Sequence, residues 1–235
     1  MAPRQTDPQL LARLTGGLFL VTFIAGIPPV FTFYVPVLSE PAYILGAGGD
    51  GGLAWGAVLE LILLVANIGT ALALYPVLRQ QNEALSLGYV AARLMECAFI
   101  AVGILCLLAI GTLRLEGAAG TTPEALVAAG RALVAVHDWT FRLGPGFVVG
   151  IGNGLILAYL LYRSRLVPRA LSSLGLIGGP LIILSGLAVV LGLIEAGGLW
   201  QGIATVPEFF WELGLGLWLL IRGFEPKALQ QLEAS

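Results

Sequence analysis

Long apolar runs are the feature that most constrains this sequence. They recur at about the length that a helix needs to cross the hydrocarbon core of a bilayer, roughly 20 residues. Only 11% of the 235 residues are charged and 58% are hydrophobic, whereas soluble domains carry about 25% charged residues. The charges are too few to cover the surface of a soluble protein of this size. The sequence therefore predicts an all-α, polytopic transmembrane helical bundle.

The apolar runs predict six membrane spans within a single membrane domain, residues 1–235. The first run is too long for a signal-peptide core and lacks a clear cleavage site, so we expect a retained helix. The segment 123–142 is only mildly apolar, and we predict an amphipathic, interfacial helix there, with a bend at Gly144-Pro145-Gly146 before the fourth span. The predicted spans are residues 14–38, 53–78, 86–112, 146–162, 171–194 and 207–224.

Basic residues predict the orientation of these spans, because Lys and Arg concentrate in short cytoplasmic segments. One side of the membrane receives most of them, so we expect both termini to be cytoplasmic in a multi-pass protein of the plasma (inner) membrane. The single lysine beside many Arg, Ala and Gly residues is typical of a bacterial source. The residues assigned to the cytoplasmic side are Arg4, Arg13, Arg79, Arg163, Arg165, Arg169, Arg222 and Lys227, and those assigned to the other side are Arg114, Arg131 and Arg142.

The third predicted span carries two opposite charges, Arg93 and Glu96, within an otherwise apolar run. Residues three apart in a helix lie on the same face. A charge in hydrocarbon costs about 2.5–3.5 kcal/mol on insertion scales. We therefore expect this face of the helix to contact protein or water rather than lipid.

Further polar residues fall at compatible depths on other spans when each is placed by the helical rise of about 1.5 Å per residue. They lie on the second span, just before the fourth and in the outer part of the sixth. Together with the charged pair they predict a polar cavity in the outer half of the membrane. The candidate residues are Glu60, Asn67, Arg93, Glu96, His137, Asp138 and Glu212.

These residues allow several interpretations. Because the carboxylates outnumber the one buried arginine, the first is a site for a small molecule, a lipid headgroup or a cation. The second is structural: Arg93 pairs with Glu96 or Glu60 and only locks helices together in a scaffold or accessory subunit. The third makes Glu60, Glu96 and Glu212 proton carriers in transport. The fourth is an intramembrane enzyme in which a carboxylate or His137 acts as a general base on a lipid-borne substrate.

Several classes of function lack support in the sequence. It contains no nucleophile motif and no phosphate-binding loop. His137 is the only histidine and no C-x-x-C pair occurs, so we predict no metal site. The net charge of −2 gives no sign of nucleic-acid binding. The expected partners are the lipid bilayer and a small-molecule or lipid ligand, and the sequence indicates no particular cofactor or oligomeric state.

Short motifs in a fixed order give the chain a resemblance to a known group of proteins. They lie in or beside the first, third, fourth and sixth predicted spans. Together they resemble a large family of uncharacterised bacterial membrane proteins, a domain of unknown function with about six helices. The resemblance implies a fold and a location, and no catalytic residues. The motifs are Ala12-Arg-Leu-Thr-Gly16, Arg93-Leu-Met-Glu96, His137-Asp138, Tyr159-Leu-Leu-Tyr-Arg-Ser164 with Pro168-Arg169, and Glu212 with Trp218-Leu-Leu-Ile-Arg-Gly223.

Overall fold

The computed structural model describes residues 7–46, 52–116 and 120–234. Arg4 and part of the segment between the first two predicted spans therefore lie outside the described residues. Within the described ranges the chain is helical, without strands. Six helices there are long and apolar enough to cross a membrane. The predicted fold class, an all-α polytopic helical bundle, is confirmed.

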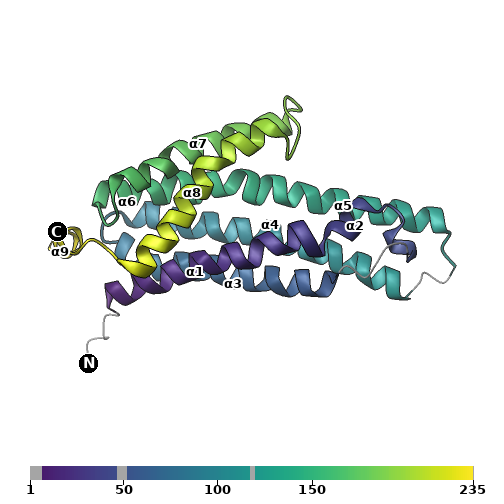
Figure 1. Cartoon of the computed structure of the whole chain (residues 1–235), viewed down its shortest axis with the longest axis horizontal. Coiled ribbons are helices and arrows are strands. Elements are labelled where there is room, and N and C mark those ends of the chain that lie inside the picture. The colour runs from purple at the N-terminus through teal and green to yellow at the C-terminus, as the bar shows by residue number, and fades with distance from the viewer. Residues whose placement is uncertain (1–6, 47–51, 117–119, 235) are drawn as a thin grey trace.

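Figure 1 shows the helices in chain order, which are joined by short helical turns labelled η. The long helices and their extensions are α1 (Pro8–Pro28), η1 (Pro29–Phe33), α3 (Leu53–Leu78), α4 (Glu83–Glu116), α5 (Pro123–Leu143), η3 (Gly144–Val148), η4 (Gly150–Leu157), α6 (Ala158–Ser164), α7 (Arg169–Val190) and α8 (Leu199–Ile221). The shorter elements are α2 (Val35–Ser39), η2 (Tyr43–Leu45) and α9 (Pro226–Glu233).

The fourth long helix differs from the sequence-based prediction. The predicted amphipathic segment is helical as α5, and it joins the predicted fourth span without a break at Gly144-Pro145-Gly146. Helical structure continues from Pro123 to Ser164 as one stretch of 42 residues. The wider π-helical turns η3 and η4 carry the chain through this region. A proline lacks the N–H that a regular turn needs, and a π-helical turn is one way for a helix to absorb such a local defect.

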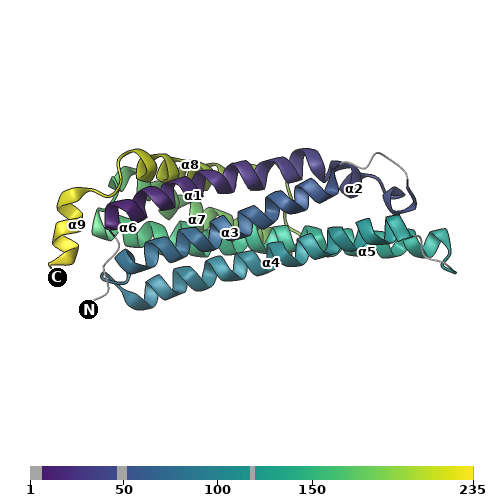
Figure 2. The same cartoon turned by 90° about the horizontal axis from the view of Figure 1, so that it is seen from below.

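The six long helices form a closed ring. Going around it, α1 packs on α3, α3 on α4, and α4 on the α5–α6 segment, which packs on α7; α7 then packs on α8, and α8 returns to α1. The start of α1 and the short helix α9 lie at the same end of the bundle (Figures 1 and 2). The ring has an interior in which side chains from helices distant in sequence can meet.

Glycines set how closely two of these helix pairs approach. A Cβ atom on Gly16 of α1 would lie 2.6 Å from the carbonyl oxygen of Gly216 on α8. A Cβ on Gly179 of α7 would lie 2.7 Å from the carbonyl oxygen of Gly150 in η4. Only glycine permits such approaches, as is common where membrane helices pack through van der Waals contact.

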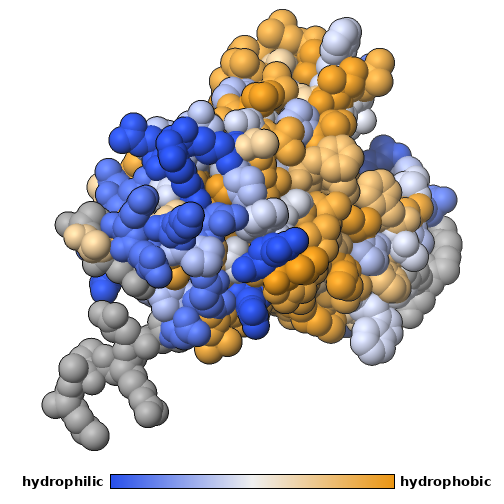
Figure 3. Space-filling model, turned by 60° about the vertical axis from the view of Figure 1, so that its left-hand side comes forward, coloured by the Kyte–Doolittle hydropathy of each residue, from blue (hydrophilic) through white to orange (hydrophobic). Residues whose placement is uncertain are grey.

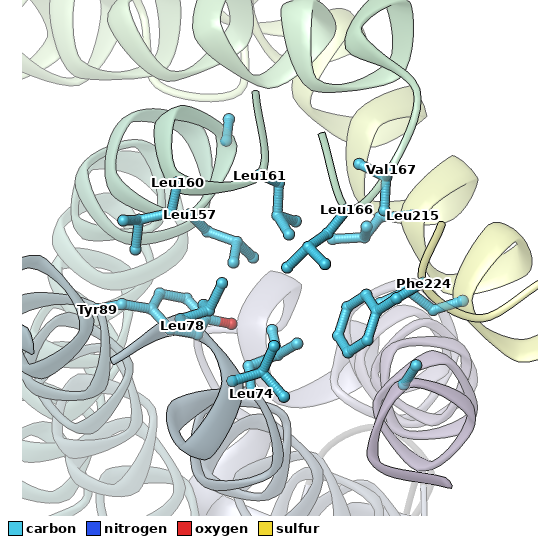
Figure 4. Close-up of a cluster of buried hydrophobic side chains, with 14 of the residues drawn as sticks. Leu74, Leu78, Tyr89, Leu157, Leu160, Leu161, Leu166, Val167, Leu215 and Phe224 are labelled. Atoms are coloured by element: carbon cyan, nitrogen blue, oxygen red, sulfur yellow. The ribbon is translucent and has the colours of Figure 1, made fainter. Parts of the chain in front are cut away.

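An apolar cluster closes the ring at the end that carries the termini of the bundle. Side chains from α3, α4, η4, α6, α8 and the connecting segments converge there (Figure 4). All members labelled in the figure are at most 1% exposed. Below we call this cluster the apolar plug; its labelled members are Leu74, Leu78, Tyr89, Leu157, Leu160, Leu161, Leu166, Val167, Leu215 and Phe224.

The surface has the distribution expected of a protein that spans a bilayer. Hydrophilic side chains gather at the end of the bundle that carries α9, whereas apolar side chains cover the flanks beyond it (Figure 3). Large apolar side chains on the helices are exposed there, for example Ile24, Val65 and Leu105, each more than 60% exposed. Such a surface is stable in lipid and would be costly in water. The chain is an integral membrane protein.

Candidate functional site

The charged pair of α4 lies inside the ring. Arg93 Nη1 donates a hydrogen bond to Glu96 Oε2 at 2.7 Å, and the side chains are 3% and 7% exposed. Of the two carboxylates that the sequence offered as partners for Arg93, Glu60 and Glu96, the structure places Glu96 there, one helical turn away. The pair is buried in protein, as the cost of a charge in lipid requires.

Two polar residues of α3 complete the contacts of this pair. Arg93 Nη2 donates to Asn67 Oδ1 at 2.7 Å, and Asn67 Nδ2 donates to Glu96 Oε1 at 3.3 Å. Thr70, one turn further along α3, lies 3.5 Å from the same guanidinium nitrogen. Asn67 thus accepts from the cation and donates to the anion, so the charges of Arg93 and Glu96 are compensated within a four-residue network.

Glu212 of α8 faces the same interior from the opposite side. Asn153 Nδ2 of η4 donates to Glu212 Oε1 in a short contact, and Asn153 is the only hydrogen-bond donor to this carboxylate among the described residues. Trp211 Nε1 donates to the Asn153 carbonyl oxygen at 3.1 Å, which holds η4 against α8. Glu212 therefore has an amide partner but no cation of its own.

Glu208 lies one turn before Glu212 on α8 and was not part of the predicted site. It is 2% exposed, and neither of its carboxyl oxygens has a hydrogen-bond partner within the described ranges. A Cβ on Gly178 of α7 would lie 2.7 Å from Glu208 Oε2, and a Cβ on Gly154 of η4 would lie 2.9 Å from it. The carboxyl group thus packs in a notch between two glycines.

A cavity of about 210 Å³ lies between the network of Arg93 and the carboxylate of Glu212. Residues of α1, α3, α4, α5, η3 and α8 line it, and they include both polar and apolar side chains. Four of the seven predicted residues are among its walls. The lining residues are Thr22, Phe23, Gly26 and Ile27 of α1, Leu63 and Asn67 of α3, Arg93, Glu96 and Ile100 of α4, Phe141 and Pro145 of α5 and η3, and Phe209 and Glu212 of α8.

Glu60 is not part of this cavity. Tyr34, between η1 and α2, donates its hydroxyl to Glu60 Oε2 at 2.7 Å, and both residues are 0% exposed. The Tyr34 ring also meets the His137 ring edge-on, with centroids 6.0 Å apart. Glu60 thus anchors the η1–α2 segment to α3, a contact that no pattern in the sequence indicated.

His137 and Asp138 line a second cavity, of about 340 Å³, beside the α7–α8 turn. His137 Nδ1 lies 3.6 Å from Asp138 Oδ1, and Asp138 Oδ2 lies 3.9 Å from Arg142 Nη2. We call this second cavity the outer cavity and the cavity beside Arg93 and Glu212 the central cavity. Phe141 is the one residue that lines both. The structure therefore divides the predicted site into the central cavity, the outer cavity and the Tyr34–Glu60 contact.

The chemistry of the central cavity follows from its charges. One guanidinium, that of Arg93, and two carboxyl groups, those of Glu96 and Glu212, line the cavity, whereas Glu208 is not among the lining residues. Arg93 and Glu96 already pair with each other, so the remaining acidic group of the lining is Glu212. No group of three or more His, Cys, Asp or Glu side chains in the described part of the chain is arranged to hold a metal ion. The cavity thus combines an acidic side chain that has no cationic partner with largely apolar walls.

One protein family matches most of the chain. A family model described as Domain of unknown function (DUF4386) matches residues 14–223. No curated protein and no solved structure matches the chain. The resemblance found from short motifs is therefore confirmed, and the family description assigns no residue a role.

Proposed function

Because this chain belongs to the DUF4386 family, whose description names no activity, we propose a function from the geometry of its own cavity. The protein binds an amphipathic organic cation within the bilayer. The positively charged head of the ligand lies against Glu212, and its apolar tail lies along the aromatic and aliphatic side chains of α1 and α8. No reaction is assigned to the bound molecule.

The single observation that carries this proposal is the environment of Glu212. It borders the cavity, and its hydrogen bond comes from the neutral amide of Asn153 rather than from a cation. The nearest arginine, Arg93, already contacts Glu96 at 2.7 Å. A carboxylate without a counter-ion is costly in a low-dielectric interior. A ligand cation placed beside it offsets this cost, whereas an anion placed there would increase it.

The remainder of the cavity wall supports an amphipathic ligand rather than a small inorganic ion. Phe23, Ile27, Leu63, Ile100 and Phe209 present hydrocarbon to the same cavity. Burying a ligand methylene against such a surface contributes about 0.8 kcal/mol. An alkyl tail therefore adds affinity that a bare cation lacks.

The test uses four small probes and purified protein in phosphatidylcholine nanodiscs, with binding measured by isothermal titration calorimetry. Hexylammonium and hexanoate each have six carbons and carry opposite charges, whereas methylammonium has the ammonium head without the long tail. Sodium ions test the alternative of an inorganic cation. We expect hexylammonium to bind more tightly than each of the other three.

Glu212→Gln is the variant that decides the role of the carboxylate, and Glu195→Gln, on the exposed α7–α8 turn, is its matched control. Loss of the charge should weaken hexylammonium binding by about tenfold, equivalent to about 1.4 kcal/mol. The control should bind like the wild type. Equal affinity in Glu212→Gln, or tighter binding of hexanoate than of hexylammonium, would overturn the proposal.

We also propose that the protein lies in the plasma membrane of a bacterial cell with both termini in the cytoplasm. This is supported by the exposed basic residues at the end of the bundle that carries α9, among them Arg79, Arg163, Arg169 and Lys227. Positively charged segments are retained on the cytoplasmic side.

Single-cysteine labelling tests this orientation. Cys97 and Cys106 are first replaced by alanine, and a cysteine is then introduced at Gln230 of α9 or at Glu124 of α5, both exposed and at opposite ends of the bundle. A membrane-impermeant maleimide added to intact cells should label the Glu124→Cys protein and not the Gln230→Cys protein. The reverse pattern would show that the termini face outward.

A further inference from the structure

The walls of the central cavity also bear on how a ligand reaches it. Three routes are conceivable: through the end of the bundle that carries α9, through the outer cavity, or sideways from the bilayer between two helices. Each route is bounded by a different set of side chains. Their packing and exposure distinguish the three.

The route from the α9 end is blocked by the apolar plug. Tyr89, Leu157 and Leu215 are each 0% exposed and belong to one continuous cluster of buried side chains. Protein interiors of this kind are close-packed and contain few voids larger than a water molecule. A charged ligand headgroup would also have to cross this layer, in which the Tyr89 hydroxyl is the only polar side-chain group among the labelled members.

The route through the outer cavity is bounded by Phe141, whose side chain contributes to the walls of both cavities. Phe141 also packs on the His137 ring, with centroids 5.0 Å apart and planes tilted by 38°. It is therefore held between the two cavities by a neighbouring ring. This makes Phe141 the alternative gate that an experiment has to exclude.

The lateral route lies between α1 and α8, and there the helices separate. Near the α9 end they touch backbone to backbone at Gly16 and Gly216. Further along, α8 crosses α1 and leads away from it (Figure 1). A Cβ on Gly202, in the first turn of α8, would meet no atom within 4 Å, so this face of α8 is open.

Two phenylalanine rings bridge the widening gap. Phe23 of α1 and Phe209 of α8 meet edge to face, with centroids 5.3 Å apart and planes at 85°. Both line the cavity, and Phe209 is also 41% exposed on the flank of the bundle. Ile27, on the same rim, is 45% exposed. The rim of the cavity is thus part of the surface that faces hydrocarbon.

We propose that the central cavity takes its ligand from the bilayer, through a portal between α1 and α8 that the Phe23–Phe209 pair closes. This inference rests on the proposed function and narrows its ligand to an amphiphile already dissolved in the membrane. The headgroup passes between the rings to reach Glu212, and the tail stays in the portal. An edge-to-face pair adds only weakly to the burial of its two rings, so side-chain rotation is enough to open it.

The experiment measures exchange rates rather than affinity alone. Dansylcadaverine, a fluorescent alkylammonium, is mixed with protein in phosphatidylcholine nanodiscs in a stopped-flow instrument. Phe209→Ala removes half of the gate together with a wall of the cavity, so it should raise the association rate of the probe by about tenfold and the dissociation rate by more than that. Phe31→Ala is the matched control, because Phe31 is 74% exposed and lines none of the cavities described above.

Phe141→Ala tests the alternative gate in the same assay. If the probe enters through the portal, this change should accelerate exchange less than Phe209→Ala does. Faster association and dissociation in Phe141→Ala, with wild-type rates in Phe209→Ala, would overturn the portal and assign entry to the outer cavity. If neither the wild type nor any variant binds the probe, the proposed function is overturned, and this inference with it.

A reversible block provides the second measurement. In a Cys97→Ala/Cys106→Ala background, Phe23→Cys and Phe209→Cys are bridged by a short, cleavable bifunctional thiol reagent. Bridging before probe addition should prevent entry, and bridging afterwards should retain bound probe until the bridge is cleaved. The same variant treated with a monofunctional reagent is the control. Wild-type exchange through bridged helices would overturn the portal.

Discussion

Replacing Arg93 by methionine tests whether the Arg93–Glu96 pair holds the helices together. The substitution keeps an unbranched, flexible apolar stem but removes the guanidinium that bonds to Glu96 and to Asn67, each at 2.7 Å. Glu96 is 5% exposed, so its carboxylate would remain buried with only the amide of Asn67 as a partner. Breaking a buried ion pair by removing one partner costs about 3–5 kcal/mol. We expect Arg93→Met to lower the free energy of unfolding by that amount.

Glu96→Leu and the double variant Arg93→Met/Glu96→Leu isolate the energy of the contact between the two side chains. Glu96→Leu alone should also destabilise, because it leaves the guanidinium buried and unpaired. The double variant should lose much less than the two single variants together, since apolar replacement of both members of a buried pair is often close to neutral. We expect a coupling energy of about 3 kcal/mol from this double-mutant cycle.

Unfolding in mixed micelles with increasing SDS, followed by circular dichroism, provides the measurement. Arg163→Met, at an exposed position, is the control and should change the unfolding free energy by no more than about 0.5 kcal/mol. Glu212→Gln should cost less than about 1 kcal/mol, because Asn153 can still donate to the amide oxygen. An Arg93→Met protein as stable as the wild type would refute the structural role of the pair.

Three further stability predictions concern contacts outside the cavity. Tyr34→Phe removes the only hydrogen bond to Glu60 among the described residues, and should cost about 1–3 kcal/mol in the same assay. Gly178→Ala would place a Cβ 2.6 Å from a backbone nitrogen of α8, so we expect a loss of about 1–3 kcal/mol, and no loss would show that the two helices can move apart freely. Gln9→Ala removes two hydrogen bonds of 2.9 Å to the backbone of Phe224, and should cost about 1–2 kcal/mol and increase proteolysis of α9, which an unchanged cleavage rate would contradict.

The polar residues show how much of the candidate site can be predicted from sequence. Arg93 and Glu96 are three apart on one helix, so their shared face follows from helical geometry alone. The presence of Glu212 in the same interior also followed, because a charge in an apolar run has to avoid lipid. The separation of Glu60 from this group did not follow. It depends on Tyr34, a residue 26 positions earlier, reaching across to α3.

The contribution of α1 was also absent from the sequence-based prediction. Its cavity residues, such as Phe23 and Ile27, are apolar and indistinguishable in type from side chains that face lipid. The burial of Glu208 could have been predicted from the sequence, because Glu208 lies one turn before Glu212 and therefore on nearly the same face of the helix. Its position in a glycine notch could not be read from that spacing, since the notch belongs to α7 and η4.

The sequence by itself determined that the chain is a bundle of six long apolar helices with a few charges turned inward, because the hydrocarbon core fixes both the length of a span and the cost of a charge. Only the tertiary structure decided which helices are neighbours, where the ring is closed and where it is open. Lipid-facing and helix-facing positions are both apolar, so hydropathy does not distinguish them. Contacts between small residues such as Gly16 and Gly216 set the approach of the helices. That packing placed Glu212 beside a cavity and Phe209 at its mouth.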